Sequence, residues 1–131
     1  MKEFTKIEKK TLEMLLDGDD SMLANLRRQL EVVIVSTREI SGSGFFTHFI
    51  LPQTSMVSAI NPDANFKIGD VNATIEGLNF GAGFLLYVEN GVISMLEAYS
   101  YDEPWPDTTD KFCISYVNGE RDLEKLKSSW S

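Results

Sequence analysis

Apolar residues near the N-terminus recur with the spacing of amphipathic helices. Residues 3–17 predict a first helix, because their apolar side chains fall near one stripe while charged ones fill the rest of each turn. The stripe contains Phe4, Ile7, Leu12, Leu15 and Leu16, and the polar remainder contains Lys6, Glu8, Lys9, Lys10 and Glu13. Gly18 is a suitable left-handed stop. Residues 19–21 can each cap the start of a second helix. We expect the core-facing side chains of that helix to be Leu23, Leu26 and Leu30.

After the second helix the pattern changes to β-branched and aromatic residues, which favour strands. The pair Asn90-Gly91 stands between two such runs and predicts a tight type I′ hairpin. Residues 41–44 are a further turn, residues 53–65 form a long loop, and residues 120–128 predict a short helix. The predicted strands are residues 31–40, 45–51, 71–76, 83–89, 92–100 and 112–117.

Helices that are set apart from a run of hairpins indicate one α+β domain over residues 1–131. We expect two N-terminal helices, then an antiparallel sheet of about five to six strands, then a short C-terminal helix. The helices should cover one side of the sheet. Neither the strand order nor the oligomeric state follows from these patterns.

The register of the predicted hairpin places Glu97 among apolar residues. With the turn at residues 90–91, Val88 faces Ile93 and, two pairs further on, Phe84 faces Glu97. Because the other members of this face are apolar or aromatic, we expect it to be the core face. An ionised carboxylate there must pair, reach water or take up a proton, so Glu97 is a candidate catalytic acid or ligand anchor. The alternative places it near the sheet end, close to solvent or Arg38.

His48 is the second candidate catalytic residue. It shares one face of its strand with Phe46 and Ile50. It could act as a general base or as a ligand for a group held over the sheet. The alternative is a partly buried histidine with one hydrogen bond. A hydrogen bond between His48 and Glu97 or Glu76 would favour a catalytic role for His48.

The segment at residues 99–107 is the candidate binding site, because three aromatic residues stand among three acidic ones. Prolines on both sides of Trp105 stiffen an extended loop. The residues proposed for binding are Tyr99, Tyr101, Glu103 and Trp105. Aromatic anchors with a charged rim are typical of interaction surfaces for a basic partner. In the alternative interpretation, Trp105 folds back as a lid over the open end of the sheet.

Charge and composition narrow the function classes. The 131 residues carry a net charge of −8, which argues against binding to nucleic acids or anionic membranes. With one cysteine and one histidine, the chain has no Cys-based or His-rich metal site. It also has no P-loop, dinucleotide fingerprint or nucleophile elbow, so we expect no metal and no cofactor. A free thiol and the absence of a signal sequence predict the cytoplasm.

Parts of the sheet region resemble a group of small bacterial proteins. The resemblance lies in residues 44–47 (Gly-Phe-Phe-Thr), in the glycine-rich residues 81–84, and in Leu-Glu-Ala-Tyr-Ser-Tyr-Asp-Glu-Pro-Trp-Pro at residues 96–106. In the segment that corresponds to residues 96–106, the group has Leu-Glu-Gly-Tyr-Thr-Tyr-Gly-Glu-Pro-Trp-Pro. Ala98 and Asp102 therefore stand where glycines are expected. The resemblance covers residues 42–106, implies a shared sheet and a bacterial origin, and carries no activity.

These observations favour a non-enzymatic protein-binding domain over an enzyme. Small size, acidity and an aromatic-acidic loop fit a domain that recognises a basic partner, as an immunity protein recognises a basic toxin nuclease. The alternative is a small-molecule-binding protein or small enzyme that uses Glu97 with His48 or Tyr99 in a pocket at the sheet end.

Overall fold

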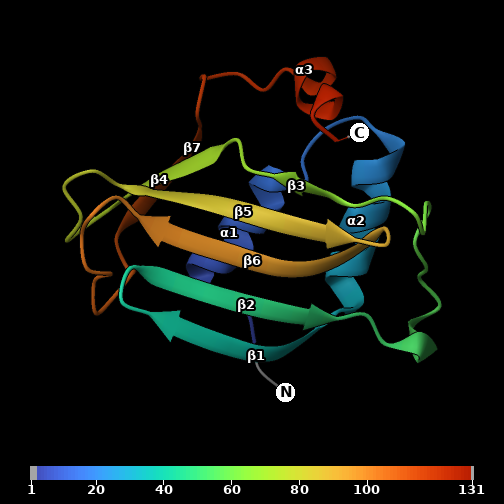
Figure 1. Ribbon diagram of the computed structural model, residues 1–131, viewed down its shortest axis with the longest axis horizontal. Coiled ribbons are helices and arrows are strands. Elements are labelled where there is room, and N and C mark those ends of the chain that lie inside the picture. The colour runs from blue at the N-terminus through green and yellow to red at the C-terminus, as the bar shows by residue number, and fades with distance from the viewer. Residues whose placement is uncertain (1–2, 131) are drawn as a thin grey trace.

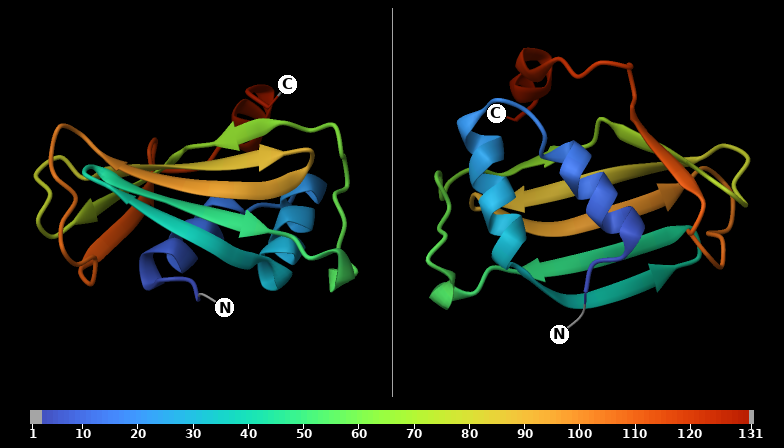
Figure 2. Two further views of the ribbon diagram at one scale, coloured as in Figure 1. Left: turned by 60° about the horizontal axis from the view of Figure 1, so that its bottom comes forward. Right: turned by 180° about the vertical axis from the view of Figure 1, so that it is seen from behind.

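The computed structural model describes residues 3–130 and has two layers (Figure 1). The helices α1 (Lys6–Leu15) and α2 (Ser21–Val32) lie together on one face of an antiparallel sheet, as the view from behind in Figure 2 shows. The strands are β1 (Ile34–Ser41), β2 (Gly44–Ile50), β3 (Phe66–Ile68), β4 (Val71–Ile75), β5 (Ala82–Glu89), β6 (Val92–Ser100) and β7 (Phe112–Tyr116). A short 3-10 helix covers Gln53–Ser55, and α3 (Leu123–Ser128) closes the chain.

The sheet has seven strands in the order β1-β2-β6-β5-β4-β7, with β3 paired beside β5. The predicted α+β class, with two N-terminal helices, hairpin-connected strands and a short C-terminal helix, is confirmed. The strand that the sequence did not indicate is β3. Its three residues pair antiparallel with the second half of β5, between Phe66↔Val88 and Ile68↔Leu86, while β4 pairs with the first half.

Polar caps begin both N-terminal helices. The backbone N–H of Glu8 donates to the Thr5 side chain, and the Thr5 N–H donates back to the Glu8 carboxylate, which completes a capping box. Asp20 caps α2 by accepting a hydrogen bond from the backbone N–H of Leu23 at 3.1 Å. The prediction of a cap at residues 19–21 is therefore confirmed, with Asp20 in that role.

The core lies between the two helices and the sheet. The fully buried side chains come from α1, α2 and the central strands, and the largest include Leu12, Leu15, Leu26, Phe84, Leu86 and Leu96. The opposite side of the sheet faces the viewer in Figure 1 and carries no helix among residues 3–130. We call it the outer face. Its half-buried side chains on β2, β5 and β6 include Phe46, His48, Leu85, Tyr87, Met95, Glu97 and Tyr99.

A β-bulge in the β5–β6 hairpin overturns the prediction for Glu97. The turn forms at Asn90 and Gly91 as predicted, and Val88 pairs with Ile93. The register then shifts by one residue at Ser94, so that Tyr87 pairs with Met95 and Leu85 pairs with Glu97. Because side chains alternate between faces, one inserted residue moves every later side chain to the other side. Glu97 therefore lies on the outer face, and Leu96 and Ala98 take the core positions.

Arg121 fastens the C-terminal segment to the helix layer. Its guanidinium donates to both carboxylate oxygens of Asp70, at 2.9 and 2.7 Å, and to the carbonyl oxygens of Leu15 and Asp17. The same group lies over the Tyr116 ring, 4.8 Å from its centroid. Arg121 thus serves the structure, because its donors satisfy carbonyl groups at the end of α1.

Candidate functional site

Glu97 stands at the middle of the outer face. Its register partners are Phe46 on β2 and Leu85 on β5. The Tyr87 hydroxyl donates to Glu97 Oε1 at 2.7 Å. This hydrogen bond to a carboxylate, together with burial, raises the pKa of Tyr87 to about 12, so the phenol keeps its proton and its role as a donor.

His48 lies on the same face as Glu97 but has a different partner. It pairs in register with Met95, which places it diagonally from Glu97. Its Nε2 lies 2.7 Å from Oε1 of Glu39, and no hydrogen bond or ion pair joins it to Glu97 or Glu76 among the described residues. The two candidate catalytic residues therefore share a surface without a hydrogen bond between them. Each forms a hydrogen bond with a neighbouring side chain instead. For His48 this agrees with the alternative of a partly buried histidine with one hydrogen bond.

The structure separates the four predicted binding residues: Tyr99 and Trp105 lie on opposite sides of the sheet, and Tyr101 and Glu103 lie in the segment after β6. Tyr99 is on the outer face, and its ring meets Tyr101 edge to face, with centroids 5.6 Å apart and planes at 83°. Burial, followed by the neighbouring Tyr101 hydroxyl, raises the pKa of Tyr99. The chain then turns at Asp102, whose φ of 56° lies in the left-handed region that glycine, the residue expected from the resemblance, adopts freely. Tyr101 is 43% exposed.

Glu103 holds a neighbouring loop. Its carboxylate accepts hydrogen bonds from the backbone N–H groups of Asn79 and Phe80, at 2.8 and 2.9 Å. Because these bonds favour the ionised form, the pKa of Glu103 is lowered. The contacts fix the loop between β4 and β5 against the segment that follows β6. The Phe80 side chain of this loop is 72% exposed.

Trp105 packs on the helix side of the sheet. Its ring meets Phe45 edge to face, with centroids 5.6 Å apart, and its backbone N–H donates to the Gly42 carbonyl at 2.9 Å. It forms one wall of a cavity of about 480 Å³ whose other walls include Phe45, Arg38 and Glu8. These contacts are those of a lid over the end of the sheet. Trp105 is thus separated from Tyr99 and Tyr101.

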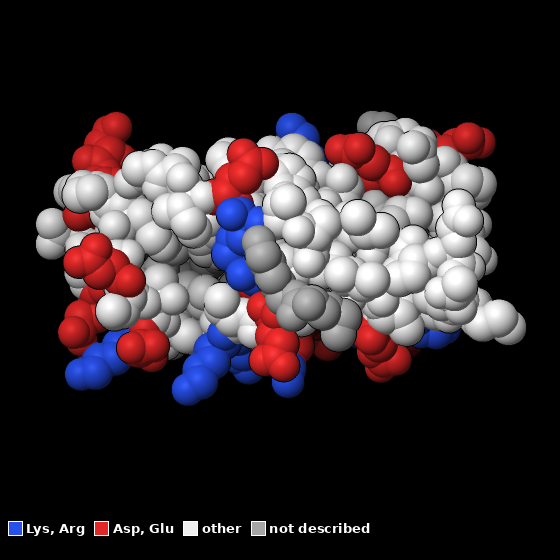
Figure 3. Space-filling model, turned by 90° about the horizontal axis from the view of Figure 1, so that it is seen from below, with Lys and Arg blue, Asp and Glu red and all other residues white. Residues whose placement is uncertain are grey.

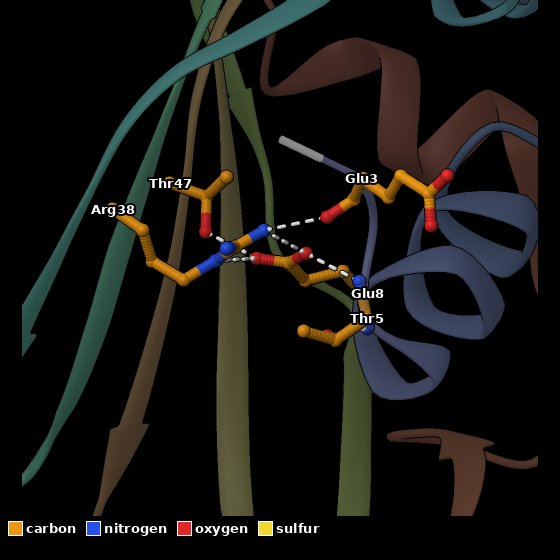
Figure 4. A network of polar contacts seen from close by, with 5 residues as sticks. All are labelled: Glu3, Thr5, Glu8, Arg38 and Thr47. Carbon is orange, nitrogen blue, oxygen red and sulfur yellow. Dashed lines mark hydrogen bonds and ion pairs between the residues drawn. The ribbon is translucent and has the colours of Figure 1, made fainter. Parts of the chain in front are cut away.

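Glu8 and Arg38 form a buried charge pair that the sequence did not indicate (Figure 4). Glu8, expected among the exposed residues of the first helix, is fully buried. Arg38 on β1 donates to both of its carboxylate oxygens, at 2.9 and 2.7 Å, and the Thr47 hydroxyl donates to Oε2. The signal available in the sequence was the Thr5-x-x-Glu8 spacing of a capping box, which turns the glutamate back toward the helix start.

A second missed feature is a groove beside Phe80 and Tyr101. It has a volume of about 370 Å³ and is lined by these two rings together with Leu78, Asn79 and Gly81 from the same loop. Strand residues Asn72, Thr74 and Ser115 form its other side. No pattern in the sequence links Phe80 to Tyr101, because the Glu103 contacts that bring their loops together span 23 and 24 residues.

No protein-family model matches the chain, and neither the curated proteins nor the solved structures contain a match. Within residues 3–130, no three His, Cys, Asp or Glu side chains are grouped so that they could hold a metal ion. In the same part of the chain, every helix is too short or too polar to cross a membrane.

Proposed function

We propose that this protein is a non-enzymatic protein-binding domain that recognises a basic partner, in the manner of an immunity protein. The observation that carries the proposal is an exposed aromatic pair, Phe80 and Tyr101, at the end of the sheet where the loops meet. Phe80 is 72% and Tyr101 43% exposed, and both line one groove. Aromatic anchors beside a hollow are the usual centre of a protein interface.

The charges around this pair favour a basic partner. The loops at this end, residues 41–44, 76–81 and 101–111, contain five carboxylates and one lysine. We call these residues the acidic rim: Glu76, Asp102, Glu103, Asp107 and Asp110, with Lys111 beside Glu76. Figure 3 shows acidic side chains at the left end of the molecule, where Figure 1 places these loops. Such a rim steers a positively charged protein toward the aromatic pair and speeds association.

The partners of the two candidate catalytic residues also favour binding over catalysis. His48 is held by Glu39 and Glu97 by Tyr87. The enzyme alternative requires Glu97 to meet His48 or Tyr99 within hydrogen-bond reach, and among the described contacts no hydrogen bond joins Glu97 to either residue. In a binding protein the same contacts simply fix the outer face in one shape.

A pull-down with matched variants tests the proposal. The tagged protein is used as bait in an extract of its native host at low salt, and bound proteins are identified. We expect one basic protein at stoichiometric level, released by high salt because screening weakens charge attraction. The Phe80→Ala/Tyr101→Ala variant should lose it, whereas Ile60→Ala, which truncates a 51% exposed side chain of the loop at residues 53–65, should retain it. Equal capture by all three baits would refute the proposed surface.

A further inference from the structure

Glu97 lies among apolar and aromatic side chains of the outer face, with His48 diagonal to it and Glu39 on the far side of Phe46. Across the strands it faces Phe46 and Leu85, and along β6 its neighbours on the same face are Met95 and Tyr99. Directly opposed side chains on one face of a sheet have Cβ atoms about 4.5–5.5 Å apart, so these groups surround the carboxylate. A charge among apolar groups interacts more strongly with an opposite charge than one in open water does.

The Glu97 carboxylate has acceptor capacity left over. Its Oε1 accepts from the Tyr87 hydroxyl at 2.7 Å, and among the described contacts Oε2 accepts from no donor. An ionised carboxylate offers about four lone-pair sites and can accept two parallel N–H bonds from a guanidinium. The side chain is half-buried, so Oε2 can be reached from the open side of the sheet.

Of the two tyrosine rings beside Glu97, one is already covered by a cation of the chain itself. Lys67 already lies over the face of Tyr87, with Nζ 4.9 Å from the ring centroid. Tyr99 is held down on Gly83, where an added Cβ would come within 2.4 Å of Tyr99 Cζ. The Tyr99 ring therefore lies close to the backbone of β5 beside Glu97, and it continues to Tyr101 through their edge-to-face contact.

We propose that Glu97, flanked by Phe46 and Tyr99, is the anchoring point for an arginine side chain of the basic partner. The inference rests on the proposed function and names the group that the partner inserts. Arginine fits because its planar guanidinium pairs with a carboxylate through two N–H donors and stacks on aromatic rings at the same time. Tyr99 and Tyr101 make this anchor continuous with the aromatic pair and acidic rim.

A peptide titration locates the anchor without knowledge of the natural partner. The isotope-labelled full chain is titrated with hexa-arginine peptide at low salt and followed by NMR. We expect the largest shifts at Phe46, Glu97 and Tyr99, and Glu97→Gln should weaken binding about tenfold, since it removes the charge of a desolvated pair. The glutamine keeps an oxygen for Tyr87, so the fold should be retained. Glu13→Gln, which removes an exposed charge from α1, is the matched control and should change affinity less than about twofold.

Three results would contradict the proposal that Glu97 binds an arginine side chain. The first is an equal loss of affinity in Glu97→Gln and Glu13→Gln, because the peptide would then respond to net charge alone. The second is hexalysine peptide binding as tightly as hexa-arginine, because an ammonium lacks the planar pair of donors. The third is a set of shifts confined to residues 76–81 and 101–110. This last result would contradict an arginine site at Glu97 but would leave the acidic rim as the binding surface. Failure of the proposed function would instead appear as a pull-down that captures no basic protein.

Discussion

The Arg38 guanidinium binds the fully buried Glu8 carboxylate with two N–H donors, Nε to Oε2 at 2.9 Å and Nη2 to Oε1 at 2.7 Å. The backbone N–H of Thr5 and the hydroxyl of Thr47 supply the remaining donors. One carboxylate thereby ties the start of α1 to β1 and β2. A buried charge is tolerated only when it is paired and hydrogen-bonded in this way.

Removal of the arginine should therefore be costly. Arg38→Met leaves an uncompensated carboxylate inside the protein, and we expect a loss of about 3–5 kcal/mol in the free energy of unfolding. Urea denaturation measures it. Arg28→Met, at an exposed position of α2, should cost little, and a Glu8→Gln/Arg38→Met variant should recover much of the loss. A single-variant loss as small as that of Arg28→Met would contradict the structural role of the pair.

The stability of the loop between β4 and β5 should depend on pH through the ionisation of Glu103. Because the N–H groups of Asn79 and Phe80 favour its ionised form, the folded pKa of Glu103 lies below the ordinary value of 4.5. The stabilisation is therefore fully present above pH 4.5 and is lost as the pH falls through the lowered folded pKa. NMR titration of the Asn79 and Phe80 amide protons should show a midpoint below 4.5 that disappears in Glu103→Gln. A midpoint at or above 4.5 would rule out the proposed contacts.

Trp105 should contribute to stability and leave partner binding unchanged. Its half-buried ring packs on Phe45, so Trp105→Ala is expected to cost about 2 kcal/mol, less than truncation of a fully buried aromatic ring. Trp105→Phe should retain most of this stability. Denaturant titration and capture of the basic partner are the two measurements. An unchanged stability with lost capture would move Trp105 into the interaction surface.

Gly83 should control the position of Tyr99. The added Cβ of Gly83→Ala would meet Tyr99 Cζ at 2.4 Å, so the ring would have to move from its present position beside Glu97. Because the end of a side chain can move, we expect a stability loss of about 1 kcal/mol and weaker binding of hexa-arginine peptide. Gly42→Ala is the matched control, since its Cβ would meet nothing within 4 Å. Equal peptide affinity in the two variants would show that Tyr99 takes no part in the anchor.

Several local elements were predictable because their cause lies within a few neighbouring residues. The Asn90-Gly91 turn needs only two residues that accept positive φ, and they have φ values of 54° and 74°. The Asp20 cap needs only an oxygen next to the first free N–H groups of α2. The apolar stripe of the first helix predicted the buried Ile7, Leu12, Leu15 and Leu16 for the same reason.

The candidate site was less predictable, because its geometry depends on residues far apart in the chain or on one irregular step. A bulge at Ser94 changes the face of Glu97, and periodicity contains no sign of an inserted residue. The loop carrying Phe80 is fixed by Glu103, more than 20 residues away. The segment of residues 99–105 leaves the sheet at Ser100 and turns at Asp102, which sends Tyr99 and Trp105 to opposite sides.

The sequence by itself thus determined the α+β class, the order of most elements and the acidity of the surface, because each depends on composition or on spacing along the chain. Only the tertiary structure decided which carboxylates are buried and which face the open side of the sheet. Glu8 enters the core because Arg38, 30 residues later, compensates its charge. Glu97 leaves the core because one extra residue in β6 reverses the alternation of side chains.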